Sequence, residues 1–351
     1  MTLRRSEQPQ GHELGRVAVR ATGVGSLPGE NVRAAVRLVV DELPDLPHLP
    51  ELATRGAPAG MVGRAVGLLA GLGADLQPAG WRLTDAPGID QRRARSQLAE
   101  DLDALEEHTQ GHLGPLKLQV AGPWTLAAAV ERPRGDRVLA DHGARRDLAQ
   151  SLAEGVAAHV ADVARRVPGA GIVVQVDEPS LPAVLAARVP TASGFGRHRS
   201  VTAAEASSGL GWVLSAIETA GARPVVHCCA ADVPVPLIAG AGAEALLVDA
   251  GLLPTDSYDD LAAAIDGGLD LWPGVVPTSE PSRRPAAEQL AESVHRLWSA
   301  LGYGPSDLID RTVVTPACGL GAAAFGWARQ ALVLARDTAR QLSVEGETVR
   351  P

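Results

Sequence analysis

The residues with the clearest chemical potential are cysteines and a histidine that follow short apolar runs. His227, Cys228 and Cys229 end one such run, and Cys318 follows another. Side chains two apart in a strand share a face, so His227 and Cys229 are expected to point one way and Cys228 into the core. One imidazole nitrogen and two thiolate sulfurs are ligands typical of zinc. The sequence therefore predicts a Zn²⁺ site built from His227, Cys229 and Cys318.

A carboxylate at another predicted strand end could complete this site. Asp249 follows the apolar run Ala245–Val248 and is a candidate fourth ligand, although an acid there could instead bind substrate or cap the next helix. A single free cysteine is often a small buried apolar residue. That explanation accounts poorly for all three cysteines of the chain gathering at strand ends, and their odd number argues against a disulfide framework.

Two adjacent acids end a further strand. Asp177 and Glu178 precede Pro179 in an otherwise apolar segment. Buried acids are costly unless they are paired, so a bound cation such as a substrate ammonium would offset the cost. Helix capping or a structural ion pair is the alternative. Glu51 is a second candidate for binding an ammonium, and it could equally be a surface acid.

A glycine-containing loop follows the first predicted strand. In this loop Gly25 would let a ligand approach the backbone, and Ser26 adds a hydroxyl donor, which together suit a carboxylate. An ordinary tight turn is the alternative. The loop is not a dinucleotide fingerprint, because the third glycine and the later acidic residue are missing.

The elements that must position these residues alternate between short apolar runs and longer segments of helical period. This alternation is typical of parallel strands joined by helices and predicts an α/β fold, a single-domain (β/α)₈ TIM barrel. The barrel is expected over residues 16–341, between an N-terminal tail (1–15) and a polar C-terminal tail (342–351). The expected strands are Val17–Val24, Leu49–Leu52, Leu116–Ala121, Gly171–Val176, Pro224–Cys228, Ala245–Val248, Leu269–Val275 and Thr312–Thr315.

Composition excludes several classes of protein. The chain has 351 residues and a formal net charge of −9, and its basic residues are dispersed. No general attraction for nucleic acid or anionic lipid is expected of such a chain. No secretory signal and no run of about 18 apolar residues is found, so a cytoplasmic location and no membrane partner are expected.

Five segments, in this order, resemble the C-terminal catalytic barrel of cobalamin-independent methionine synthase, in the superfamily that also holds uroporphyrinogen decarboxylase. The Asp-Glu-Pro, His-x-Cys and Pro-x-Cys-Gly-Leu pieces are specific together, whereas the glycine loop alone is not. The matching segments are Val24–Pro28, Ala121–Thr125, Gln175–Pro179, His227–Cys229 and Thr315–Leu320.

The resemblance implies roles for most of the candidate residues. Zinc would be held by His227, Cys229 and Cys318, and Asp249 stands where the family has a glutamate ligand. Gly25 and Ser26 would bind the carboxylate of homocysteine. Its ammonium would be bound by the acids, which are Asp177 and, by a looser match, Glu51.

The donor side departs from the family. The resemblance implies that Trp124 lies where the family stacks a folate ring. The catalytic histidine of the family is missing from Gly274–Pro281, where Ser279 or Glu280 lies nearest, and we see no corrinoid-binding domain. Without that acid, we expect a methylated corrinoid on a separate protein to be a better methyl donor than methyl-tetrahydrofolate.

The resulting expectation is a zinc-dependent S-methyltransferase that forms methionine from homocysteine. Zinc would deprotonate the substrate thiol, and Asp249, as the weakest ligand, could yield its place to it. One alternative is a zinc-dependent corrinoid methyltransferase acting on another thiol such as coenzyme M. Another is a non-catalytic zinc- or thiol-binding barrel.

Overall fold

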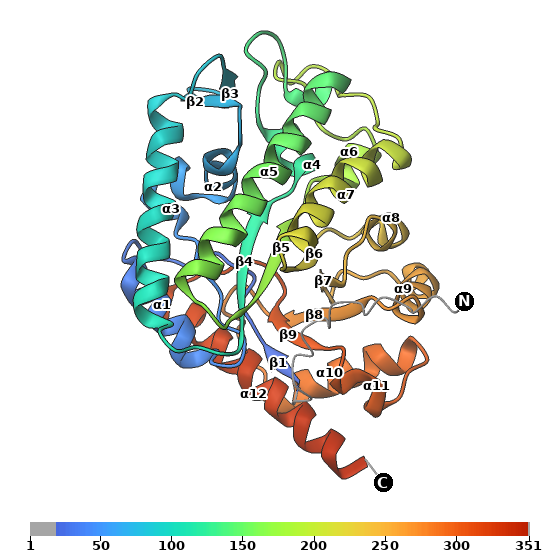
Figure 1. Cartoon of the computed structure of the whole chain (residues 1–351). Coiled ribbons are helices and arrows are strands. Elements are labelled where there is room, and N and C mark those ends of the chain that lie inside the picture. The colour runs from blue at the N-terminus through green and yellow to red at the C-terminus, as the bar shows by residue number, and fades with distance from the viewer. Residues whose placement is uncertain (1–18, 350–351) are drawn as a thin grey trace, which may run out of the picture.

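A curled parallel sheet forms the centre of the molecule. The computed structural model describes residues 19–349, and in this range the sheet contains seven strands in the order β1-β9-β8-β7-β6-β5-β4 (Figure 1). Every neighbouring pair in it is parallel. The α/β class is therefore confirmed, with a TIM-like arrangement. The strands are β1 (Arg20–Ala21), β4 (Pro115–Ala121), β5 (Gly171–Asp177), β6 (Arg223–Cys228), β7 (Ala245–Asp249), β8 (Asp270–Val276) and β9 (Val313–Pro316).

The strand expected at Leu49–Leu52 is not found in the described residues. Isolated parallel bridges join His48 to Lys117 of β4 and Glu51 to Ser26, just after β1. This segment therefore lies between the two edges of the sheet without forming a regular strand. Its prolines, at positions 47 and 50, explain this, because proline has no N–H to donate to a strand ladder.

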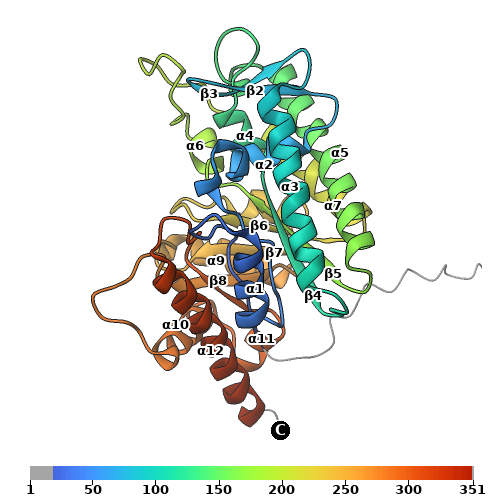
Figure 2. The same ribbon diagram turned by 90° about the vertical axis from the view of Figure 1, so that its left-hand side faces the viewer.

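Helices cover the outer face of the sheet, and a large apolar core fills the space between them (Figures 1 and 2). Apolar side chains spaced three or four residues apart, from Leu148 to Val167, are buried in this core. The long helices are α1 (Val32–Glu42), α3 (Ile89–His108), α5 (His142–Arg166), α7 (Ala203–Thr219), α10 (Ala287–Ala300) and α12 (Phe325–Val349). Shorter ones are α2 (Met61–Leu68), α4 (Pro123–Ala129), α6 (Leu181–Leu185), α8 (Val235–Gly240), α9 (Tyr258–Asp266) and α11 (Pro305–Ile309).

Short polar side chains fix where several of these helices begin. Asn31, Asp141 and Thr202 each accept a hydrogen bond from a backbone N–H three residues later, at the starts of α1, α5 and α7. Such caps satisfy N–H groups that the helix itself leaves unpaired. None of the helices in residues 19–349 is long and apolar enough to cross a membrane.

A second apolar cluster fills the inside of the sheet. It takes residues from almost every strand, and side-chain alternation puts the chemically useful residues on the same inner face, nearer the carboxyl ends of the strands. On β6, for example, Val225 belongs to the inner cluster and Val226 to the outer core. The inner cluster consists of Val24, Leu46, Val173, Val225, Ala245, Leu247, Trp272 and Val313.

Two regions differ from the sequence-based expectation. An antiparallel hairpin of β2 (Gly73–Gln77) and β3 (Gly80–Thr84) was not predicted, and Figure 2 shows it at the opposite end of the molecule from α12. The predicted C-terminal tail (342–351) is wrong in its first part, because α12 continues to Val349. Leu342 is fully buried, so packing extends the helix past the predicted boundary. The predicted N-terminal tail (1–15) lies outside the described residues.

Candidate active site

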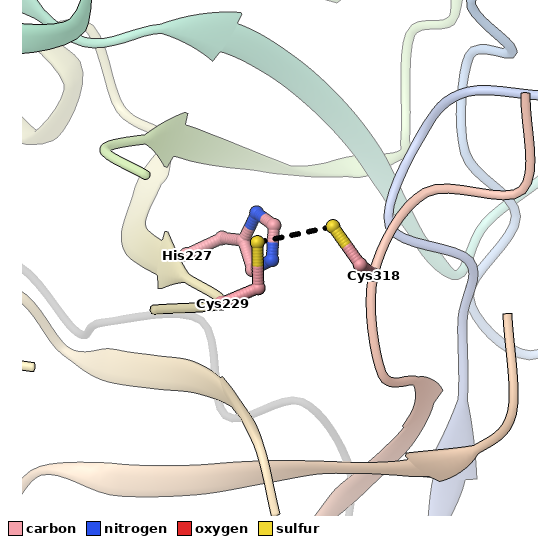
Figure 3. A group of neighbouring side chains, drawn as sticks. All are labelled: His227, Cys229 and Cys318. Carbon is pink, nitrogen blue, oxygen red and sulfur yellow. Dashed lines mark hydrogen bonds between the residues drawn. The ribbon is translucent and has the colours of Figure 1, made fainter. Parts of the chain in front are cut away.

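Three potential metal ligands meet where two strands end. His227 lies in β6, Cys229 follows it directly, and Cys318 lies in the loop after β9. One ligand atom from each residue lies within 4.8 Å of the other two, and the two sulfurs are 3.0 Å apart (Figure 3). The sequence-predicted set is therefore brought together from positions about ninety residues apart in the chain.

The imidazole of His227 is held from one side. Its Nδ1 lies 2.8 Å from Oδ1 of Asp177, the last residue of the neighbouring strand β5. Its Nε2 is buried and has no hydrogen-bond partner among the described residues. A histidine that binds metal usually donates its other ring N–H to a carboxylate, so this arrangement leaves Nε2 available as a ligand.

The surroundings of the two sulfurs shift their pKa values in opposite directions. The hydrogen bond with Cys229 and the adjacent His227 lower the pKa of Cys318 to about 4. The same hydrogen bond, together with burial, raises the pKa of Cys229. Burial acts to lower the pKa of His227, but Asp177 and Cys318 raise it to about 9. The group thus already contains one sulfur that gives up its proton easily.

The residues fit zinc in type and in spacing. With Zn–S near 2.3 Å and Zn–N near 2.0 Å, tetrahedral ligand atoms lie about 3.5–3.8 Å apart. The observed group falls within reach of that spacing, and the orphaned Nε2 of His227 is the nitrogen such a site requires. Three protein ligands with an open fourth position are typical of catalytic zinc sites.

Asp249 and Cys228 have different surroundings from these three. Asp249 ends β7, but it is not part of the ligand group, and its Oδ1 accepts a hydrogen bond of 2.9 Å from the backbone N–H of Gly251. The structure therefore gives its predicted ligation no support, and this hydrogen bond caps the turn after β7 and not the next helix. Cys228 is fully buried in the outer core, as predicted, and burial raises its pKa to about 12.

The glycine loop packs directly against the loop that carries Cys318. The hydroxyl of Ser26 accepts a hydrogen bond from the N–H of Gly321, and a side chain on Gly319 would collide with that hydroxyl. A side chain on Gly25 would collide with Gln119. The Ser26 O–H thus remains free to donate, at a place fixed by the same loop as a metal ligand.

Glu51 lies close enough to Asp177 for their charges to interact. Burial raises the pKa of Glu51 to about 7, with Arg64 opposing the rise and Asp177 adding to it. The backbone N–H of Met61, the first residue of α2, also faces this carboxylate. Glu51 is therefore buried and not a surface acid, and a cation between it and Asp177 would relieve the repulsion.

Glu178 and Trp124 have structural roles. Both carboxylate oxygens of Glu178 accept hydrogen bonds from backbone N–H groups at the start of α4, which is the capping alternative. Trp124 is buried in the outer core, and its indole N–H donates to the carbonyl of Ala206 on α7. The structure therefore gives the expected stacking of Trp124 on a folate ring no support, because the indole is enclosed between helices.

The two weak candidates for a catalytic acid lie in the loop after β8. Ser279 and Glu280 are both exposed, and the Glu280 carboxylate is hydrogen-bonded to the Arg284 guanidinium. These contacts involve no residue of the metal group. The structure therefore gives neither residue a catalytic role.

The sequence analysis missed a polar layer inside the barrel, between the metal group and the inner apolar cluster. Lys117 and Gln119 of β4 and Gln175 of β5 are buried there. Lys117 donates to Gln175 and to the carbonyl of Val24, and Gln119 donates to the carbonyl of Leu49. The sequence did contain a feature that could have predicted this layer, because a lysine between Leu116 and Leu118 is unusual in a buried strand.

Comparisons with known proteins agree with this geometry. The family model described as "Cobalamin-independent synthase, Catalytic domain" matches residues 119–341, a range that includes all three ligands but not Ser26 or Glu51. No curated protein matches the chain in sequence.

One solved structure shows the same fold. A B12-independent methionine synthase from Shewanella sp. W3-18-1, solved in complex with selenomethionine, has a TM-score of 0.63 at 12% identity, covering 95% of this chain and 100% of that one. A β-mannanase from the blue mussel Mytilus edulis has a TM-score of 0.43 at 12% identity, with 92% of each chain covered. The family match spans more than half of the sequence and implies a methyltransferase. The chain belongs to the family of cobalamin-independent synthase catalytic domains.

Proposed function

We propose that this protein is a zinc-dependent methyltransferase that forms methionine from homocysteine, with methyl-tetrahydrofolate as donor. The observation that carries the proposal is the convergence of His227, Cys229 and Cys318, with Nε2 of His227 buried and unpartnered. In the reaction, the homocysteine sulfur attacks the methyl carbon and the carbon–nitrogen bond of the donor breaks. The electron pair of that bond stays on the donor nitrogen, which takes up a proton.

The metal site would consist of three protein ligands and one open position. His227 supplies a nitrogen, and Cys229 and Cys318 supply sulfurs. A zinc ion bound there would lower the pKa of the homocysteine thiol and keep it as a nucleophilic thiolate. Asp177 holds the ring of His227 through Nδ1, so the ligand is oriented before any metal binds.

The amino-acid end of homocysteine would bind beside this position. The Ser26 hydroxyl, which keeps its proton free, suits the substrate carboxylate, and Gly25 allows close approach of the backbone. The buried carboxylates of Glu51 and Asp177 suit the ammonium. The packing of the glycine loop against the Cys318 loop supports these assignments.

Methyl-tetrahydrofolate is the donor that the family favours. Membership of a cobalamin-independent family does not support the predicted preference for a methylated corrinoid, nor a corrinoid-dependent enzyme acting on coenzyme M. The Shewanella neighbour was solved with selenomethionine, the selenium analogue of the proposed product. This supports a site for a methionine-like ligand in the same fold.

The test is methionine formation from homocysteine and methyl-tetrahydrofolate by the zinc-loaded chain. The expected result is turnover that disappears in Cys318→Ser, with Cys228→Ser as a matched control that keeps it. Absence of methionine from zinc-loaded wild-type protein would contradict the proposal.

A further inference from the structure

The chain contains one lysine, and it is buried inside the barrel below the metal group. Lys117 is the only lysine in the sequence, whose other 31 basic residues are all arginines. It lies on β4 and is fully buried. Its neighbour in the strand register, Val173, belongs to the inner apolar cluster. Burying an ammonium there costs several kcal/mol of folding free energy unless hydrogen-bond partners compensate for the lost water. The partners of Lys117 therefore indicate its role.

The partners of Lys117 begin a continuous hydrogen-bonded chain. Its Nζ donates to Oε1 of Gln175 at 2.9 Å and to the carbonyl of Val24 at 3.0 Å. The Nε2 of Gln175 donates to Oδ1 of Asp177 at 2.7 Å and to the same carbonyl at 2.8 Å. The reversed amide would face N–H toward the ammonium and oxygen toward the carboxylate. Lys117 therefore fixes which way the Gln175 amide points.

This series of hydrogen bonds reaches both the metal group and the glycine loop. Asp177, held by Gln175, is the acceptor for Nδ1 of His227, and Nε2 of the same ring is left for the metal. The carbonyl of Val24, held by Lys117 and Gln175, immediately precedes the Gly25–Ser26 loop. One ammonium is thus connected to a metal ligand on one side and to the substrate loop on the other.

We propose that Lys117 is a positioning residue: through Gln175 it holds Asp177 in the orientation that accepts from His227 Nδ1, and so presents His227 Nε2 to the metal. The proposal rests on the proposed function for its metal, but the Lys117–Gln175–Asp177–His227 arrangement itself needs no metal.

The choice of lysine agrees with this role. An arginine would carry a wide planar fork with five N–H groups, which two acceptors in a packed interior cannot satisfy. Lysine offers a compact donor. Burial lowers the pKa of Lys117 to about 7, while the carboxylates of Asp177 and Glu51 raise it. The ammonium therefore also offsets part of the negative charge that the two acids bring into the barrel.

The experiment compares metal-free wild-type protein with two variants, each labelled with ¹⁵N-histidine. In the wild type, the Nδ1–H of His227 should give a downfield proton signal protected from exchange, assigned by its loss in His227→Gln. Lys117→Met should lose that protection. Gln175→Glu gives Lys117 an ionic partner but cannot donate to Asp177, so it should lose the protection without leaving the ammonium unpaired. Co²⁺ affinity, measured by chelator competition, should fall about 10-fold or more in both variants.

Val225→Ala is the matched control, because Val225 is the register partner of Gln175 on β6 and its truncation removes apolar volume without removing a donor or acceptor of this hydrogen-bonded series. It should lower the free energy of unfolding and keep both the protected proton and the Co²⁺ affinity. If Lys117→Met does not fold, Gln175→Glu decides alone. A protected Nδ1–H and a Co²⁺ affinity within twofold of wild type would make Lys117 merely structural. Failure of the wild type to bind Co²⁺ would instead contradict the proposed function, since the proton signal is read without metal.

Discussion

At the scale of single residues, strand alternation separates two adjacent cysteines into different roles. Cys228 faces the outer core and Cys229 faces the ligand group, because successive side chains of β6 point to opposite faces of the sheet. The sequence was sufficient for this assignment, because side chains two apart in a strand share a face and Cys229 is two residues after His227.

The first prediction uses this pair. Cys229→Ser should lose most of the bound zinc, because a hydroxyl is a poor replacement for a thiolate ligand. Cys228→Ser should keep the zinc and lower the free energy of unfolding by about 1–3 kcal/mol, because a hydroxyl would be buried among apolar groups. Metal analysis and urea unfolding of both variants check this. Equal zinc loss in the two would show that the register of β6 is wrong.

Glu51 supplies a prediction about pH. Its pKa of about 7 means that its carboxyl is mostly protonated below pH 7 in the free protein, whereas an ammonium prefers the carboxylate. Methionine affinity should therefore fall as the pH drops from 8 to 6, with proton release on binding at the lower pH. In Glu51→Gln, affinity at pH 8 should fall by the 1.5–3 kcal/mol of a charge-assisted hydrogen bond, about 10–100-fold, and this proton release should vanish.

Calorimetry with methionine, in two buffers of different ionisation enthalpy, measures both quantities. Methionine is used because it has no thiol proton to release. If Glu51→Gln binds methionine with the proton release of the wild type, the ammonium is bound elsewhere.

What the sequence could not supply at this scale was the partner of each polar group. Types and spacing were enough for His227, Cys229 and Cys318. Trp124 and Asp249 were assigned by position in a motif. The indole N–H of Trp124 donates to the backbone of α7, and the Asp249 carboxylate accepts from the backbone of its own turn. Such partners depend on how helices and turns pack, which alternation along one strand does not determine.

At the scale of elements, the long periodic segments were predictable and the irregular ones were not. Strands β4 to β9 follow apolar runs whose ends agree with the prediction to within about two residues. The segment before Glu51 makes only isolated bridges because its prolines interrupt the ladder. The β2–β3 hairpin has Pro78 and Gly80 at its turn, but its strands contain almost no β-branched residues. The position of the segment before Glu51 is therefore determined by packing.

A buried ionic cluster holds the segment that follows Glu51. Asp101 of α3 accepts hydrogen bonds from Arg64 of α2 and from Arg55, the last residue of the 3₁₀ turn η1 (Ala53–Arg55). Asp101 and Arg64 are almost completely buried, whereas Glu100, which also pairs with Arg55, is 61% exposed. The cluster thus connects η1 and α2 to α3, and it holds in place the segment that follows Glu51 in the sequence.

Removing the buried carboxylate of this cluster should lower the free energy of unfolding much more than removing its exposed carboxylate. Asp101→Ala should lower the free energy of unfolding by about 3–5 kcal/mol, because it leaves the guanidinium of Arg64 buried without its carboxylate. Glu100→Ala should lower it by about 0–1 kcal/mol, as expected for an exposed pair. Urea unfolding of both variants provides the comparison. Similar values would mean that water reaches the Arg64–Asp101 pair.

At the scale of the whole molecule, the ligand group joins distant parts of the chain. His227 lies in β6 and Cys229 directly follows that strand, whereas Cys318 follows β9, three strands further around the sheet. Folding brings the three ligand atoms together, whereas in the unfolded chain Cys318 is far from the other two residues. An ion that binds the folded state alone must stabilise the entire barrel.

Zinc should therefore raise the melting temperature of the wild-type chain, and a chelator should lower it again. At free zinc 100 times the Kd, the added stability is about 2.7 kcal/mol, which for a chain of this size corresponds to a few degrees or more. Cys229→Ser should show almost no shift, while Asp249→Ala should keep it, since Asp249 bonds to Gly251 and lies outside the ligand group. Calorimetric melting with and without zinc measures all three proteins. A shift lost in Asp249→Ala as completely as in Cys229→Ser would make Asp249 a ligand after all, and the site would then be closed until the substrate thiol displaces it.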